Sequence, residues 1–223
     1  MSELAPPLDL LPPLLRGLGD TARLALGGSL LGAVAALAAG LARVAGPRAV
    51  RALAASYVEI FRGTSALVQL FWFYFALPFL GLELSAMAAG VLVLGLNSGA
   101  YGAEVVRGAI RAVPRAQWEA AQALGFSSGQ TLARIIFPQA ALAMMPPAGN
   151  LAIELLKNTA LASMVTLSEL TFRAQMLRAE TLRTVEIFGL VLLLYFGLAQ
   201  AIRLGLARAE ARLAKGRDHG GLR

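Results

Sequence analysis

The sequence contains no cysteine and only one histidine, His219, among its 223 residues. The absence of cysteine excludes disulfides, thiolate metal sites and a cysteine nucleophile. A single histidine cannot form a zinc-binding histidine cluster, and no serine–histidine, histidine–glutamate or paired-aspartate arrangement is present. The Gly-x-x-x-x-Gly-Lys-Ser/Thr phosphate loop is also missing. We therefore expect no catalytic residue, no metal site and no nucleotide held by such a loop.

Charged residues are also scarce. They make up 15% of the chain, whereas soluble domains carry about 25%, and 57% of the residues are hydrophobic. The mean hydropathy is +0.66, which favours one membrane domain over two soluble ones. The net charge of +7 does not indicate nucleic-acid binding, because the basic residues flank apolar runs and form no patch with interleaved aromatics.

Long uncharged runs predict an all-α integral membrane protein with five transmembrane helices. A helix needs roughly 20 apolar residues to cross ~30 Å of hydrocarbon. The Gly-Thr-Ser at 63–65 predicts a local irregularity in the second helix, and Pro146 with Pro147 suits the first turn of the fourth. The predicted spans cover residues 24–42, about 52–80, 84–107, 146–166 and 185–203, with an amphipathic extramembrane helix at 168–183.

The chain is predicted to form one membrane domain with two short flanking segments. Residues 1–20 are predicted to be an interfacial lead-in on the outer side, because Arg16 and Asp20 argue against a span. Residues 21–208 form the transmembrane domain, and residues 209–223 form a basic cytoplasmic tail.

The interval 112–142 is predicted to be a water-exposed helix–turn–helix between the third and fourth spans. Residues 119–124, which begin with Glu-Ala-Ala, suit a short helix. Gly125 fits the end of that helix, where a left-handed backbone is needed. Ser127 or Ser128 can cap the turn that follows.

This interval carries a spaced motif: Glu-Ala-Ala, three residues, Gly125, nine residues, then Ile135 and Pro138. The pattern resembles the signature loop of the membrane subunits of ATP-binding-cassette importers, with Phe137 in place of the usual leucine. Three more stretches, in the same order along the chain, are similar to polar amino acid permeases of that superfamily. They lie at residues 57–64, 101–108 and 156–161.

The resemblance implies a permease subunit of an importer in the bacterial cytoplasmic membrane, not an enzyme. The expected partners are a second permease copy or a homologous permease, two cytoplasmic ATP-binding-cassette ATPases and an extracytoplasmic solute-binding protein. The chain itself would carry no cofactor, because ATP is bound by the ATPase. The resemblance further implies that a coupling helix between the third and fourth spans docks into the ATPase, through Glu119, Ala120, Ala121, Gly125, Ile135 and Pro138.

Lysine and arginine indicate the orientation. They are concentrated in the segments that become cytoplasmic if the coupling loop lies inside the cell, in agreement with the positive-inside rule. Five spans then place the N-terminus outside and the C-terminus in the cytoplasm.

Polar residues within the spans predict a solute pocket. A charge at the bilayer centre costs roughly 2.5–3.5 kcal/mol, so such residues should face a partner or a wet cavity. Asn150, Glu154 and Asn158 recur every four residues and share one helical face. A zwitterionic solute needs donors for its carboxylate and an acceptor for its ammonium. The candidate pocket residues are Gln69, Asn97, Tyr101, Glu154 and Asn158.

Several alternatives remain open at this point. Glu154 and Lys157 could instead form an internal ion pair, as could Glu104 with Arg107 and Glu59 with Arg62. The solute could be another small organic molecule within the same superfamily. A carrier that needs no ATPase is a further alternative, although such carriers usually have more helices or an inverted repeat.

Overall fold

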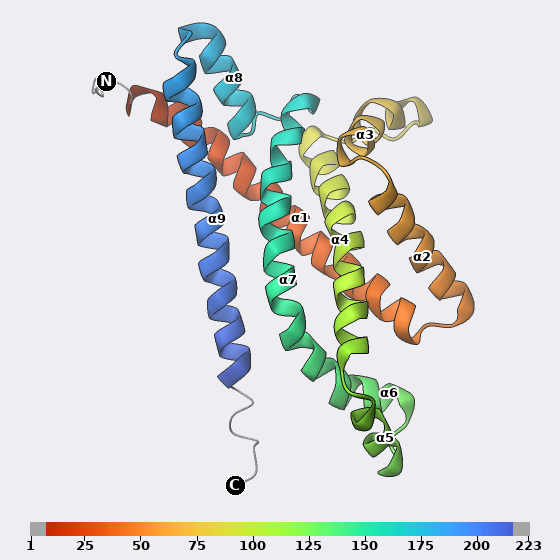
Figure 1. Cartoon of the computed structure of the whole chain (residues 1–223). Coiled ribbons are helices and arrows are strands. Elements are labelled where there is room, and N and C mark those ends of the chain that lie inside the picture. Colours follow the sequence, from red (N-terminus) through yellow and green to blue (C-terminus); the bar gives the residue numbers. More distant parts are fainter. Residues whose placement is uncertain (1–7, 216–223) are drawn as a thin grey trace.

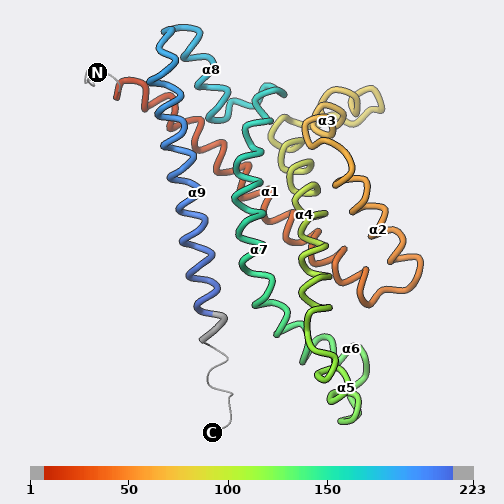
Figure 2. Tube along the Cα trace, viewed as in Figure 1, coloured from red at the N-terminus to blue at the C-terminus, as the bar shows by residue number. Residues whose placement is uncertain are grey.

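The computed structural model describes residues 8–215, with side chains to residue 212, and this part consists of helices joined by short loops, with no strand. The longest helix crosses the others diagonally, and α9 runs alongside α7 (Figures 1 and 2). The helices are α1 (Leu11–Ala45), α2 (Arg48–Gly63), α3 (Ala66–Phe71), α4 (Ala86–Ala112), α5 (Arg115–Ala123), α6 (Ser128–Thr131), α7 (Phe137–Asn158), α8 (Leu170–Thr181) and α9 (Thr184–Lys215).

Three helices of the described chain are long and apolar enough to cross a membrane: Leu8–Ala45, Ala86–Ala112 and Thr184–Arg212. The bent pair Arg48–Gly63 and Ala66–Leu80 could form a fourth span. α7 is not in this group, since its apolar character is interrupted by residues such as Glu154 and Lys157. The all-helical class is therefore confirmed, and the number of five transmembrane spans stays a prediction.

The first helix begins earlier than the sequence predicts. Residues 11–20, expected to be a separate lead-in, form the first turns of α1. Pro12 and Pro13 cause no break because they lie at the start of the helix, where a missing N–H leaves no bond unmade. Leu14 is fully buried in a cluster with α8 and α9, so this end of α1 is anchored by packing.

Small residues let α1 and α4 approach closely. A side chain at Gly102 would put its Cβ 2.6 Å from the Cβ of Ala36, and one at Gly95 would lie 3.0 Å from the carbonyl oxygen of Gly28. Such small-residue faces are a common packing device between helices in membranes. The resulting α1–α4 pair is the scaffold that positions the polar residues of α4.

The second predicted helix is not continuous. α2 ends at Gly63, and the chain turns by 102° before it continues through α3, a π-helical segment (Trp72–Ala76) and a 3₁₀ turn (Leu77–Leu80). The break falls at the Gly-Thr-Ser of residues 63–65, so the predicted irregularity is confirmed, and it divides the helix predicted over about 52–80 into two.

The fourth predicted helix also differs. α7 begins at Phe137, directly after the π-helical segment Leu132–Ile136, and holds Pro146 and Pro147 in its interior. The prediction that these prolines start the helix is wrong, because Pro138 already occupies the first turn. Interior prolines are tolerated in membrane helices, where neighbouring groups satisfy the freed carbonyls.

Candidate functional site

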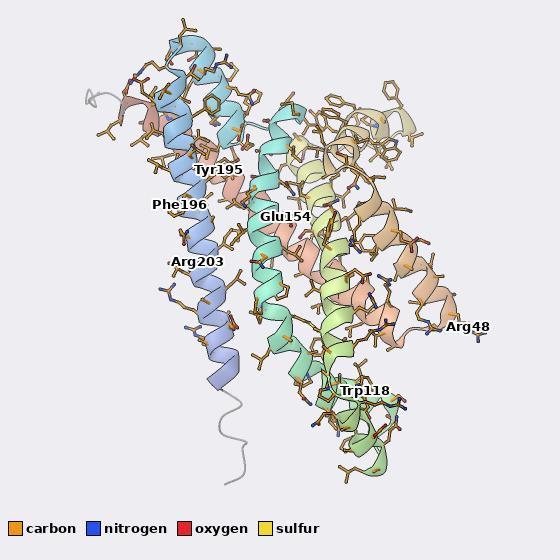
Figure 3. All side chains as sticks on the ribbon, viewed as in Figure 1. Arg48, Trp118, Glu154, Tyr195, Phe196 and Arg203 are labelled. Carbon is orange, nitrogen blue, oxygen red and sulfur yellow. The ribbon has the colours of Figure 1, made fainter. Side chains whose placement is uncertain are left out.

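Four of the five predicted pocket residues meet between α4 and α7. Asn97 and Tyr101 of α4 and Glu154 and Asn158 of α7 line a small cavity together with Ser98 and three leucines. Figure 3 labels Glu154 part-way along α7. The cavity measures about 10 Å³, which is room for about one water molecule. An amino acid would therefore require α4 and α7 to separate.

Gln69, the fifth predicted residue, does not reach this cavity. Its Nε2 donates to the Thr64 hydroxyl at 2.6 Å and to the Phe61 carbonyl at 3.0 Å. Both acceptors lie at the end of α2, where helix carbonyls lack intrahelical partners. The structure thus gives Gln69 a role in holding the break between α2 and α3.

Two residues that line the cavity also contact the end of α2, next to the α2–α3 break. Asn97 lines the cavity, and its Nδ2 donates to the same Phe61 carbonyl at 2.7 Å. The guanidinium of Arg62 lies 5.0 Å from the ring centre of Tyr101, within the range of a cation–π contact. The end of α2 is therefore held by two residues that also form the cavity wall.

The predicted ion pairs have mixed outcomes. Glu104 accepts from Nε of Arg107 at 2.9 Å, so that pair is confirmed. Glu104 also accepts from Arg43 at the end of α1, a partner that the sequence did not indicate. Among the described side chains, neither Glu59 with Arg62 nor Glu154 with Lys157 forms a salt bridge. Glu154 therefore keeps a carboxylate that no basic side chain within the described chain neutralises.

The predicted coupling segment forms two short helices joined by a glycine turn. α5 begins at Arg115, four residues before Glu119, and the two side chains form an exposed ion pair at 3.0 Å. Gly125 has φ +81°, so the predicted left-handed turn is confirmed. Ser127 accepts from the backbone N–H of Gln130, whose side chain accepts in return, so Ser127 is the cap.

The exposed face of this segment contains an apolar residue that the motif did not single out. Leu124 is 76% exposed, beside Gly125, whereas Ala121 is buried and Ala120 exposed. Trp118 (Figure 3) packs with the foot of α4 and α7 and joins the segment to the bundle. Ile135 lies in the π-helical segment before α7, and Pro138 lies in the first turn of α7.

Comparison with known proteins identifies the family. The profile of the family described as "Binding-protein-dependent transport system inner membrane component" matches residues 28–209. This chain belongs to that family. The permease is thus a multi-pass inner-membrane protein and a transporter component, and its family works with ATPase and binding-protein partners.

Relatives of the permease match it over almost its whole length. It is 46% identical to a probable amino-acid ABC transporter permease protein, y4tF, of Sinorhizobium fredii, covering 95% of this chain and 91% of the relative. It is 35% identical to the glutamine transport system permease protein GlnP of Escherichia coli, with 91% and 94% covered. A crystal structure of an amino acid ABC transporter with histidines has a TM-score of 0.83 at 33% identity, covering 91% and 94%.

The permease also contains a buried carboxyl that sequence reasoning did not single out. Glu169 is fully buried and caps α8, because its Oε1 accepts from the backbone N–H of Phe172 at 2.7 Å. Its Oε2 accepts from two hydroxyls, that of Tyr195 on α9 at 3.0 Å and that of Thr21 on α1 at 3.3 Å. Figure 3 labels Tyr195 on α9. Burial raises the pKa of Glu169. One carboxyl thus joins three helices, and its position directly before an amphipathic helix is the only local signal of this role.

Proposed function

We propose that this permease is the membrane subunit of an ATP-driven importer that moves polar amino acids inward across the bacterial cytoplasmic membrane. The observation that carries the proposal is the meeting of Asn97, Tyr101, Glu154 and Asn158 between α4 and α7, in a family of binding-protein-dependent transport components. The relatives named for amino acids or glutamine support this solute class.

The chemistry of the cavity suits a zwitterion. Glu154 offers an unneutralised carboxylate for an ammonium group, and the amides of Asn97 and Asn158 can donate to a carboxylate. A charge in the bilayer centre costs roughly 2.5–3.5 kcal/mol, which favours a role for Glu154 in a wet path. The closed cavity, about 10 Å³, opens in this proposal as the ATPases move the helices.

The segment 112–142 serves as the contact with the ATPase in this proposal. Its α5 helix exposes Glu119 and Leu124, which supply a hydrogen-bond acceptor and an apolar contact. Gly125 allows the sharp reversal that makes α5 protrude. Exposed Ala120 permits close approach of the ATPase, whereas Ala121 is buried within the chain. Ile135 precedes α7 and Pro138 lies in its first turn, so both link the contact to that helix.

The complete transporter follows from the same proposal. Five spans, with the bent α2–α3 unit as the second and α7 as the fourth, place the N-terminus outside and the C-terminus in the cytoplasm. Two ATPase subunits, a second copy of this permease or a homologous one, and an extracytoplasmic solute-binding protein complete the assembly. ATP binds in the ATPase, and this chain carries no cofactor.

The test is transport in vesicles reconstituted with the permease and its co-expressed neighbours. A panel of polar amino acids should include at least one that stimulates both ATP hydrolysis and uptake. Gly125→Pro should uncouple the two, because proline cannot adopt φ +81°, while the subunit still inserts. Gly129→Ala is the matched control, since its Cβ would meet nothing within 4 Å.

Three outcomes would contradict the proposal. If no amino acid stimulates the complex but another small organic ion does, the solute class is wrong. Uptake by this chain without ATP would identify an independent carrier. If residues that flank Gly125 can be labelled from the outer side of the membrane, the orientation is the reverse of the one proposed.

A further inference from the structure

An apolar groove of about 310 Å³ lies between α1, α4 and α7, and it shares Ser98 and Leu151 with the small polar cavity. Its walls include Ala36 of α1, Val105 of α4, and Ala141 and Met145 of α7. Serines at two lining positions are its only polar side chains, and no charged side chain lines it. In a membrane protein, such a groove favours an apolar occupant over water.

A positively charged cluster lies beyond one end of the groove. Arg43 follows Ala36 by seven residues, so it lies on the same face of α1 and about 10 Å farther along the axis. There Arg43 and Arg107 both donate to the single carboxylate of Glu104, which leaves the cluster with one net positive charge. Each guanidinium has five N–H groups, and most of them have no partner among the described side chains.

We propose that this groove and cluster bind one anionic phospholipid. An acyl chain occupies the groove, and the phosphate contacts Arg43 and Arg107. A helix of another protein is about 10–12 Å wide with its side chains. An alkyl chain is thinner, and the net charge of the cluster favours an anionic headgroup over a zwitterionic one.

The groove adjoins the base of the coupling segment. Ala36, Val106 and Met144 line it and also belong, with Ile136, to the buried cluster against which Trp118 packs. A bound acyl chain therefore touches the same residues that hold the coupling segment to the bundle. We expect the anionic lipid to increase coupled ATP hydrolysis by stabilising this base.

Native mass spectrometry of the permease, purified with its ATPase and delipidated, tests the proposal. Titration with phosphatidylglycerol and with phosphatidylcholine of the same chains should give about fivefold tighter binding of the anionic lipid. Glycerol 3-phosphate should not compete, which separates a lipid site from a site for free phosphate. Equal affinities, or displacement by glycerol 3-phosphate, would overturn the proposal.

Two variants test the charged cluster and the apolar groove one at a time. The triple change Arg43→Gln, Glu104→Gln and Arg107→Gln removes the net charge without leaving a lone carboxylate, and should abolish the preference for phosphatidylglycerol. Ala148→Phe adds a ring to an exposed lining position and should weaken both lipids about tenfold. Arg48→Gln on α2, an exposed arginine, is the control. If the preference survives the triple change, or if Ala148→Phe leaves both affinities unchanged, a second permease copy or ordinary surrounding lipid covers the groove instead.

Discussion

Replacement of Glu169 tests whether the buried carboxyl network fixes the arrangement of α1, α8 and α9. Glu169→Ala removes the acceptor for three donors: the Phe172 N–H and the hydroxyls of Thr21 and Tyr195. Loss of a helix cap costs about 1 kcal/mol. Each buried donor left unpaired costs about 1–3 kcal/mol. Because the Tyr195 hydroxyl also lies 3.1 Å from Thr171, part of that loss can be recovered.

The free energy of unfolding should therefore fall by roughly 3–5 kcal/mol in Glu169→Ala. At about 2–4 °C per kcal/mol for a chain of this size, the Tm should fall by about 10 °C. Glu169→Gln keeps the acceptor for the Phe172 N–H, and the two hydroxyls can rotate to accept from its amide. We expect it to cost about 1 kcal/mol.

The pH dependence of stability follows from the direction in which the pKa of Glu169 is shifted. Burial raises the pKa of Glu169 above its ordinary value of 4.5, with the hydrogen bonds that the carboxyl accepts opposing the effect. The folded state therefore binds the proton more tightly than the unfolded state does. The stability that this group contributes is fully present below the unfolded pKa and is lost as the pH rises through the raised folded pKa. Glu169→Gln should remove this decline.

Thermal unfolding of the detergent-purified protein, followed by the fluorescence of Trp72 and Trp118 between pH 4 and pH 8, measures both effects. Glu180→Ala is the control, because Glu180 is exposed on the same helix, and it should change stability by less than ~0.5 kcal/mol. A Tm of Glu169→Ala equal to that of the control, or an unchanged pH profile in Glu169→Gln, would refute the reasoning.

Two further changes test the packing of α1 on α4 and the α2–α3 break. Gly102→Val should lower stability by about 1–3 kcal/mol through overpacking, because its Cβ would lie 2.6 Å from that of Ala36. A Cβ added at Gly108 would meet nothing within 4 Å, so Gly108→Val should leave the Tm nearly unchanged. If the two variants lower the Tm equally, the close approach of α1 to α4 at Gly102 is contradicted. Gln69→Leu should speed amide hydrogen exchange at residues 64–68, since the end of α2 loses three hydrogen bonds. Unchanged exchange would argue that Asn97 alone holds the break.

Features set by local chemistry were predictable from the sequence. Gly125 has the predicted left-handed conformation and Ser127 forms the predicted cap, because both depend on a few neighbouring residues. The four-residue spacing of Glu154 and Asn158 also placed them on one face, which does meet Asn97. Their roles in transport stay predictions.

Features set by distant partners were not predictable. Arg43 pairs with Glu104 across 61 positions, and nothing near either residue indicates that pairing. Gln69 was assigned to the solute pocket because a buried polar residue in a span needs a partner, but its partners are backbone and hydroxyl groups at the end of α2. Composition identifies the need for a partner, and only the tertiary arrangement identifies which partner it is.

The shared carbonyl of Phe61 decides how the pocket residues should be interpreted. Asn97 and Gln69 both donate to it, although only Asn97 lines the cavity. A solute that draws the Asn97 amide away would leave Phe61 held by Gln69 alone, at the point where the chain bends by 102°. Loss of transport in an Asn97 variant would therefore not by itself identify Asn97 as a solute ligand. Glu154 and Asn158, which have no such bond to the break, are the residues whose substitution separates solute recognition from the geometry of α2.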